Sequence, residues 1–290
     1  MLNIGVRSVR SAMAVILLGL GAAACSAQGE EVPTVMVTAS SQVDLPLMEY
    51  LPSDEEMELM ILAAFKLQSE CAARFGLELP PDRPGEEDVS DYFNLRRRYG
   101  LLNREEVVRY GYDSPPLPTD SDDEAHPDLS EEVMTGRTAT GDASTMKDSE
   151  GQLIPPGGCE QESWDSLRGD IPLGYFTPSL GLLEEARIRM QEDPGYKAAE
   201  ADWADCMTAA GHDFRQLHEA GASVKAAPPE EKKQMALQEL ECSLNVNFPG
   251  RAMTVDVEIQ NELVARNGEL LAGVLDQHRR MLEKAGEALN

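Results

Sequence analysis

The stretches ECAARFGLEL, residues 70–79, and DCMTAAGHDF, residues 205–214, share one pattern: an acidic residue, a cysteine, four residues, a glycine, two residues and a large apolar residue. Apolar residues at three- and four-residue spacing lead up to each cysteine, as in a helix with one buried face. The glycine follows where a left-handed residue commonly ends a helix. The sequence therefore predicts two helices that each carry a cysteine near their C-terminal end.

Helical periodicity continues on both sides of these stretches. Ser53 and Glu56 have the spacing of a capping box and open the helix that leads to Cys71. Aromatic residues make up only 5% of the chain, which suits helix packing better than a β-sandwich. Further helices are predicted over residues 86–98, 104–110, 160–168, 179–192, 195–210, 229–245 and 252–287, the last either continuous or broken at Asn267 and Gly268.

The predicted fold class is mainly α: a disulfide-stapled helical domain or domains with a long acidic loop and at most a small β-hairpin. The acidic loop is rich in turn formers and poor in apolar residues, so it has little surface to bury against its ordering entropy. A hairpin is possible around residues 149–151. The predicted parts are a signal peptide (1–24), a flexible tether (25–51), a first helical part (52–112), the acidic loop (113–150) and a second helical part (151–290) packed with the first as one domain.

The N-terminus has the features of a bacterial export signal. Arg7 and Arg10 precede an uncharged run, residues 11–24, that is too short to span a membrane and is followed directly by Cys25. Residues 20–25 resemble a lipoprotein box, with Ala22 at the position where such boxes usually carry leucine. We expect Cys25 to be lipidated after cleavage, which anchors the chain at the extracytoplasmic face of the cell membrane. The alternative is ordinary cleavage that leaves a free thiol.

The chain has five cysteines, so four remain if Cys25 carries a lipid. Four cysteines allow three pairings, and the sequence does not choose among them rigorously. The sequential pairing of Cys71 with Cys159 and of Cys206 with Cys242 is favoured, because a helical hairpin can close the short loop between the last two. A metal site that uses His212 or His218 is disfavoured, since the chain has no C-x2-C or H-x3-H pair.

The charge of the chain excludes nucleic acid as a natural partner. The sequence has 25 basic and 52 acidic side chains. Without the two arginines of the leader, 23 basic against 52 acidic side chains leave a formal charge of −29. Phosphate backbones would be repelled. Such a surface suits cations or a basic partner, although solubility alone commonly explains an acidic bias.

The sequence contains no catalytic or cofactor-binding signature, and no catalytic, cofactor or metal residue is assigned. It has no G-x-S-x-G, phosphate-binding glycine loop or H-E-x-x-H motif. His126 and His278 are interpreted as exposed or satisfied histidines. His212 and Asp213 beside Cys206 could mimic a thiol dyad, but a cysteine in a disulfide is not a nucleophile. The acidic run at residues 120–124 lacks the glycine and the distal glutamate of a calcium loop.

Four segments together resemble uncharacterised exported lipoproteins of actinobacteria: RRRYGLLNREEVVRYGYDSPP (96–116), PPGGCEQESWDSL (155–167), DWADCMTAAGHDF (202–214) and ECSLNVNF (241–248). The resemblance covers most of residues 50–290. It implies an extracytoplasmic location and paired cysteines, and it supplies no activity.

Two classes of function follow from the sequence. The first is a non-catalytic, lipid-anchored envelope protein whose helical surface binds another envelope protein or a cell-wall component. The second is an exported enzyme of unrecognised type that uses acidic residues as acid and base. The first is favoured because the carboxylates are dispersed, whereas two buried carboxylates facing each other in a deep pocket would favour the enzyme.

Overall fold

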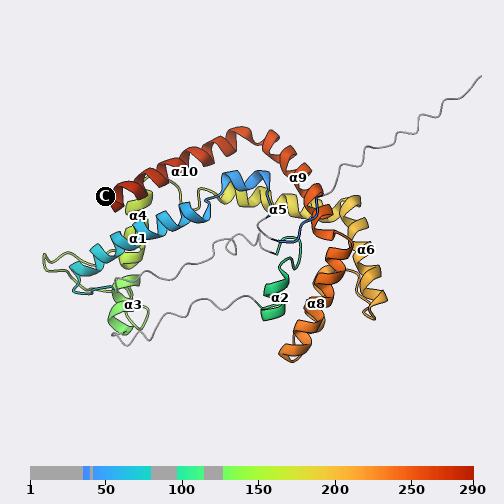
Figure 1. Cartoon of the computed structure of the whole chain (residues 1–290). Helices are drawn as coiled ribbons and strands as arrows, with labels where there is room; N and C mark the ends of the chain where they lie inside the picture. The colour runs from blue at the N-terminus through green and yellow to red at the C-terminus, as the bar shows by residue number, and fades with distance from the viewer. Residues whose placement is uncertain (1–34, 40–41, 80–96, 114–126) are drawn as a thin grey trace, which may run out of the picture. The chain divides into compact units, whose positions relative to one another are not determined.

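The computed structural model describes residues 35–39, 42–79, 97–113 and 127–290. Residues Thr34–Asn290 form one compact unit. The described ranges contain helices and no β-strand, which confirms the predicted mainly α fold (Figure 1). The elements are η2 (Pro46–Tyr50), α1 (Asp54–Arg74), α2 (Arg104–Tyr110), α3 (Pro127–Thr135), α4 (Gly158–Arg168), α5 (Thr177–Glu192), α6 (Pro194–Ala209), α7 (Leu217–Ser223), α8 (Pro229–Asn245), α9 (Phe248–Arg266) and α10 (Gly268–Leu289).

Both cysteine stretches have the expected local geometry. Gly76 and Gly211 follow α1 and α6 with φ of 79° and 95°, in the left-handed region. In α1 the N–H of Leu77 donates to the carbonyl of Ala72 at 3.1 Å, and in α6 the N–H of His212 donates to that of Met207 at 2.9 Å. In each case the residue after the glycine bonds back to the residue after the cysteine, a glycine-dependent C-cap.

The two disulfides confirm the favoured pairing. Cys71 is bonded to Cys159, with their Cα atoms 5.5 Å apart, and Cys206 is bonded to Cys242, with 5.6 Å between Cα atoms. The first joins α1 to α4, and the second joins α6 to α8. Cys25 lies outside the described residues.

Helix α1 packs against α4 and α10. Its N-terminus has the capping box in full, since the Ser53 hydroxyl accepts from the Glu56 N–H and the Glu56 carboxylate accepts from the Ser53 N–H. The buried core between these helices includes Met60, Leu167 and Met281. Of the two forms expected for the last helix, the broken one is found, because α9 ends at Arg266 and α10 starts at Gly268.

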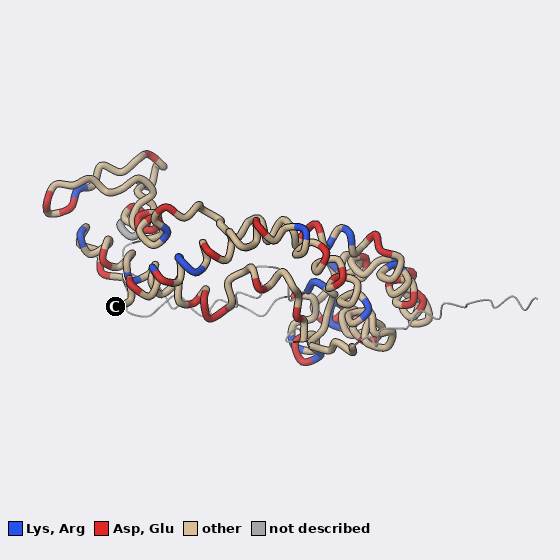
Figure 2. Tube along the Cα trace, turned by 90° about the horizontal axis from the view of Figure 1, so that it is seen from above, with Lys and Arg blue, Asp and Glu red and all other residues tan. Residues whose placement is uncertain are grey.

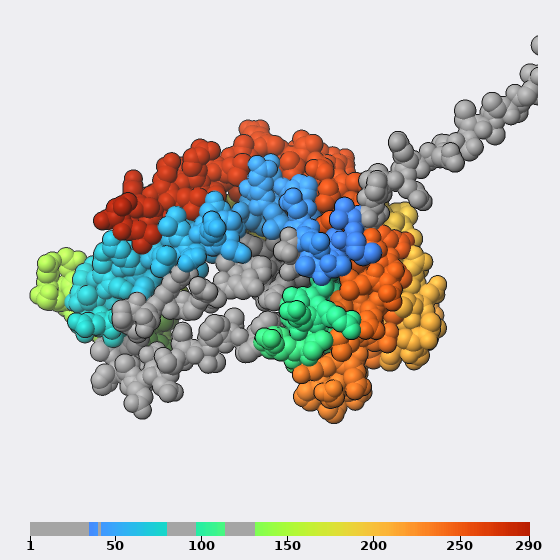
Figure 3. All heavy atoms as spheres, in the orientation of Figure 1, coloured from blue at the N-terminus to red at the C-terminus, as the bar shows by residue number. Residues whose placement is uncertain are grey.

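A second set of helices, α5, α6, α8 and α9, contributes to four further core clusters. Trp203 and Met207 of α6 lie with Cys242 of α8 in one cluster. Tyr196 of α6 and Phe248 of α9 pack edge to face, with 5.3 Å between ring centroids. Short α2 lies against α8 (Figures 1 and 3).

The prediction of a flexible tether over residues 25–51 is wrong for its last part, residues 46–51. Residues 46–50 form η2, and Leu45, Leu47 and Leu51 are buried. The N–H of Leu47 donates to the side-chain amide oxygen of Gln260 on α9 at 3.1 Å. Burial of the three leucines stabilises a segment that has no helical period of its own. Residues 25–34 and 40–41 lie outside the described residues.

The acidic loop predicted for residues 113–150 also differs from the structure where it is described. Helix α3 occupies Pro127–Thr135, and its Val133 is fully buried in a cluster with Cys71, Cys159 and Ile154. The two turns that follow contain only isolated antiparallel bridges, Arg137 with Ala143 and Lys147 with Leu153. The small hairpin at 149–151 is therefore a tight turn with one bridge. Residues 114–126, and residues 86–96 of the helix predicted over 86–98, lie outside the described residues.

Among the described residues, no helix is both long enough and apolar enough to cross a membrane. Acidic residues recur along the described chain with basic residues interspersed among them (Figure 2).

Candidate functional site

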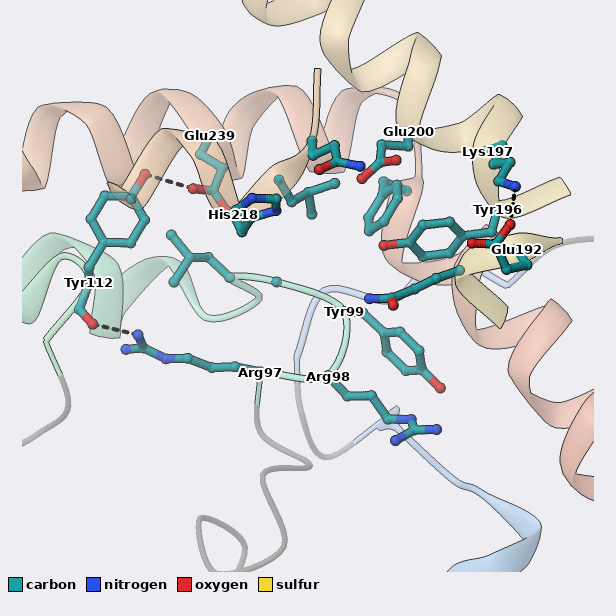
Figure 4. A pocket seen from close by; sticks show the side chains of 17 residues that line it. Arg97, Arg98, Tyr99, Tyr112, Glu192, Tyr196, Lys197, Glu200, His218 and Glu239 are labelled. Carbon is teal, nitrogen blue, oxygen red and sulfur yellow. Dashed lines mark hydrogen bonds and ion pairs between the residues drawn. The ribbon is translucent and has the colours of Figure 1, made fainter. Parts of the chain in front are cut away.

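The candidate site is a cleft with a volume of about 700 Å³. Its walls come from residues 97–101, from Tyr112, from the end of α5, and from α6, α7 and α8, with Phe248 of α9 (Figure 4). Four aromatic and three acidic side chains share this lining with three basic ones: Tyr99, Tyr112, Tyr196 and Phe248; Glu192, Glu200 and Glu239; Arg97, Arg98 and Lys197.

Glu239 is the most deeply buried carboxylate of the cleft, with 4% of its surface exposed. The hydroxyl of Tyr112 donates to its Oε2 at 2.6 Å. Burial raises the pKa of the Glu239 carboxyl to about 7, because its charged form loses water, while the Tyr112 hydrogen bond and the charge of Arg97 act in the opposite direction. Glu239 therefore exchanges its proton near neutral pH.

Arg97 ties the cleft wall to the end of α2. Its guanidinium donates to the backbone carbonyls of Tyr112 and Asp113, the latter at 3.1 Å, and lies 3.8 Å from a carboxylate oxygen of Glu106. Figure 4 shows the guanidinium directed toward the Tyr112 carbonyl. Arg97 thus supports the position of Tyr112, which in turn donates to Glu239.

A buried polar network holds the next two residues of this wall. Asp256 of α9 is fully buried and accepts from the Arg98 Nε at 2.5 Å, from the Tyr99 hydroxyl at 2.7 Å and from the Gln260 side-chain amide at 2.9 Å. Arg98 also donates to the carbonyl of Leu183 on α5 at 3.1 Å. The network fixes residues 97–101 against α5 and α9, with the Arg98 charge neutralised by Asp256.

The opposite wall is formed by α6. Burial raises the pKa of the Glu200 carboxyl, while a hydrogen bond from the backbone N–H of Leu217 and the charge of His218 lower it. The Lys197 ammonium lies 2.6 Å from a carboxylate oxygen of Glu192. Figure 4 shows Lys197 directed toward Glu192. In the same view Glu200 is separated from Glu239, with His218 between them.

The Cys206–Cys242 disulfide connects the two helices that carry these carboxylates. Glu239 and Cys242 lie three residues apart on α8, and Glu200 and Cys206 are both on α6. The bond fixes the separation of the α6 and α8 walls. A structural role in positioning the cleft follows from this geometry.

Glu239 and Glu200 have different hydrogen-bond donors and different charged neighbours. Glu239 is bonded to the Tyr112 hydroxyl, and Glu200 accepts from the Leu217 N–H. The charge of Arg97 acts on Glu239. The charges of His218 and Glu219 act on Glu200. Each carboxylate has its own protein donor.

The histidines weighed in the sequence occupy different places. His218 lines the cleft, whereas His212 stacks on Phe214 with 5.7 Å between ring centroids. His278 is buried, with its Nδ1 2.5 Å from the Tyr175 hydroxyl and its Nε2 3.3 Å from a carboxylate oxygen of Glu56. No group of three potential metal ligands occurs within the described ranges. His126 and the acidic run at 120–124 lie outside them.

The sequence does not predict the cleft, although it contains one signal for it. Ala236, Leu240 and Ser243 are buried positions of α8, and Glu239 lies on the same face at helical spacing. A charged residue within an apolar stripe of a helix requires a polar partner or a cavity. Tyr112, 127 residues away, offered no such local signal.

A scan against protein-family models found no match, and comparisons with curated proteins and with solved structures found no significant match either.

Proposed function

We propose that the mature chain is a lipid-anchored envelope protein at the extracytoplasmic face of the cell membrane, where it acts as a non-catalytic binding module. The observation that carries this proposal is the pairing of Cys71, Cys159, Cys206 and Cys242 in two disulfides. These bonds account for every cysteine except Cys25, which directly follows the export signal. Structural disulfides also fit an oxidising compartment outside the cytoplasm. The resemblance to exported actinobacterial lipoproteins points in the same direction.

The cleft is the surface best suited to binding. It has a volume of about 700 Å³ and aromatic walls. Hydrogen bonds hold its polar groups, as between Tyr112 and Glu239 and between Tyr99 and Asp256. Such concave sites with a few placed polar groups are the usual form of a ligand site. The partner under this proposal is an envelope protein or a cell-wall component.

An exported enzyme is the second candidate, and one observation favours it. A carboxyl whose pKa is about 7, as in Glu239, can act as a general acid or base at neutral pH. The binding role is preferred because Glu200 on α6 and Glu239 on α8 lie on different walls of the cleft and neither is among the charges that act on the other.

The anchoring is tested by fractionation of cells that produce the wild-type protein or a Cys25→Ala variant. The wild-type protein should stay with the membranes through a carbonate wash, and the variant should be released. Globomycin, which blocks lipoprotein signal cleavage, should leave the wild-type protein with an unprocessed leader. A wild-type protein that washes off, or a variant that remains bound, would contradict the proposed anchor.

A further inference from the structure

We propose that the cleft binds a small organic cation of the amine or guanidine class, held by the carboxylates of Glu200 and Glu239 against aromatic walls. This inference rests on the proposed binding role and names the chemical class of its ligand. It follows from a comparison of the cleft's basic side chains, which have acidic partners within the chain, with two of its carboxylates, which have none among the described residues.

The basic side chains of the cleft are occupied by the protein itself. Arg98 is paired with buried Asp256. Lys197 is paired with Glu192 at 2.6 Å. The Arg97 guanidinium donates to two backbone carbonyls at the end of α2. Arg97 also lies 3.8 Å from a carboxylate oxygen of Glu106, so each of these three basic groups already has an acidic partner within the chain.

Two carboxylates of the cleft, in contrast, form no ion pair within the part of the chain that the structure describes. Glu239 accepts one hydrogen bond from Tyr112 through Oε2, and Glu200 accepts from the Leu217 N–H. A carboxylate has about four acceptor sites on its two oxygens, so each retains capacity for a cationic donor. A bound cation would replace the water that burial removes from Glu239.

The remaining walls suit the organic part of such a ligand. Tyr99, Tyr112, Tyr196 and Phe248 line the cleft. Aromatic faces attract alkylammonium and guanidinium groups and bury methylene chains. A volume of about 700 Å³ accommodates a molecule of several carbon atoms and far exceeds a single ion. A bare divalent metal ion is also disfavoured because the described residues contain no cluster of three ligands.

Proton linkage adds a further property of this site. A cation beside Glu239 favours its charged form and so lowers the pKa of a carboxyl that is otherwise about 7. Binding near pH 7 should then release a proton, and affinity should rise between pH 6 and pH 8.

The test is isothermal titration calorimetry of the full-length protein purified in detergent, at pH 8 and low ionic strength. The probe is 1,4-diaminobutane, with 1,4-butanediol as its uncharged counterpart and succinate as an anion of the same carbon number. We expect saturable binding of the diamine and none of the diol or succinate. Glu200→Gln and Glu239→Gln should each weaken diamine binding about tenfold or more.

Glu258→Gln is the matched control, because it removes the same charge from an exposed position of α9 that does not line the cleft. Its affinity should stay within about twofold of wild type, since a distant exposed charge is screened. Circular dichroism verifies the fold of each variant, and partly exposed Glu200 gives an independent readout if Glu239→Gln does not fold.

Absence of saturable diamine binding, equal binding of the diol, or equal weakening by Glu258→Gln would overturn the proposal. The fractionation test depends only on Cys25 at the N-terminus, so its outcome is independent of ligand binding in the cleft. A protein that is anchored but does not bind the diamine would overturn the ligand class alone.

Discussion

The Tyr112 hydroxyl donates a 2.6 Å hydrogen bond to Glu239, a carboxylate with only 4% of its surface exposed. The two residues lie 127 positions apart and join the turn after α2 to α8. Burial raises the pKa of both groups, so the bond connects a hydroxyl that keeps its proton to a carboxyl that titrates near neutrality. Stability should therefore depend on pH through this pair.

The contribution of Glu239 to the free energy of unfolding should fall as the pH rises from about 4.5 to about 7. In this range the folded protein keeps the Glu239 proton that the unfolded chain, with an ordinary pKa of 4.5, has lost. At ~1.4 kcal/mol per pH unit the effect is on the order of 3 kcal/mol. The measurement is urea unfolding at pH 4.5, 6 and 8 for wild type and Glu239→Gln.

Other groups also titrate in this range, so the informative quantity is the difference between wild type and Glu239→Gln. The variant should be relatively more stable at pH 8 than at pH 4.5. A difference that stays constant across the range would show that Glu239 does not titrate as described.

Tyr112→Phe should lower the free energy of unfolding by about 1.5–3 kcal/mol at pH 8, where Glu239 is charged, and by about 0.5–1.5 kcal/mol at pH 5. The loss is larger at pH 8 because hydrogen bonds to charged groups are the stronger ones. Tyr110→Phe, at the end of α2 and two residues before Tyr112, is the control and should change stability by less than about 0.5 kcal/mol. Equal losses at the two pH values would argue against a charge-assisted bond.

Asp256→Ala should cost about 3–5 kcal/mol, because it leaves the Arg98 guanidinium buried without its counter-charge. Arg98→Ala should cost a similar amount, and the double variant should cost clearly less than the sum. Asp276→Ala, which breaks an exposed pair with Arg279, should cost no more than about 1 kcal/mol. Thermal unfolding gives all four values, and additive losses at Asp256 and Arg98 would exclude coupling.

Val133→Ala should destabilise the chain by roughly 2 kcal/mol, because Val133 is fully buried beside the Cys71–Cys159 disulfide. Val108→Ala removes the same two methyl groups from a residue that is 53% exposed and should have little effect. Chemical denaturation of both variants makes the comparison. If Val133→Ala is as stable as Val108→Ala, residues 127–135 would again be interpreted as a dispensable loop.

The sequence alone predicts those elements whose structure is determined by neighbouring residues. The helix that ends at Gly76 and the helix that ends at Gly211 each follow from an apolar stripe and a left-handed stop. The pairing of Cys206 with Cys242 agrees with the short sequence separation of 36 residues between them.

What the sequence missed depends on contacts between distant residues. Residues 46–50 have no helical period, and their structure is stabilised by burial of leucines against α5 and α9. Helix α3 lies in a polar stretch and places a single valine in the core. The cleft requires residues 97–101 to lie against α9 through Asp256, and nothing in either local pattern indicates that contact.

The most direct measurement of the proposed anchored state is mass spectrometry of the N-terminal peptide of the wild-type protein isolated from its native membranes. We predict a peptide that begins at Cys25 and carries a diacylglyceryl group on its sulfur, because lipoprotein processing modifies the cysteine that follows the leader. An N-terminal peptide that starts at another residue, or one with an unmodified Cys25 thiol, would contradict the proposal.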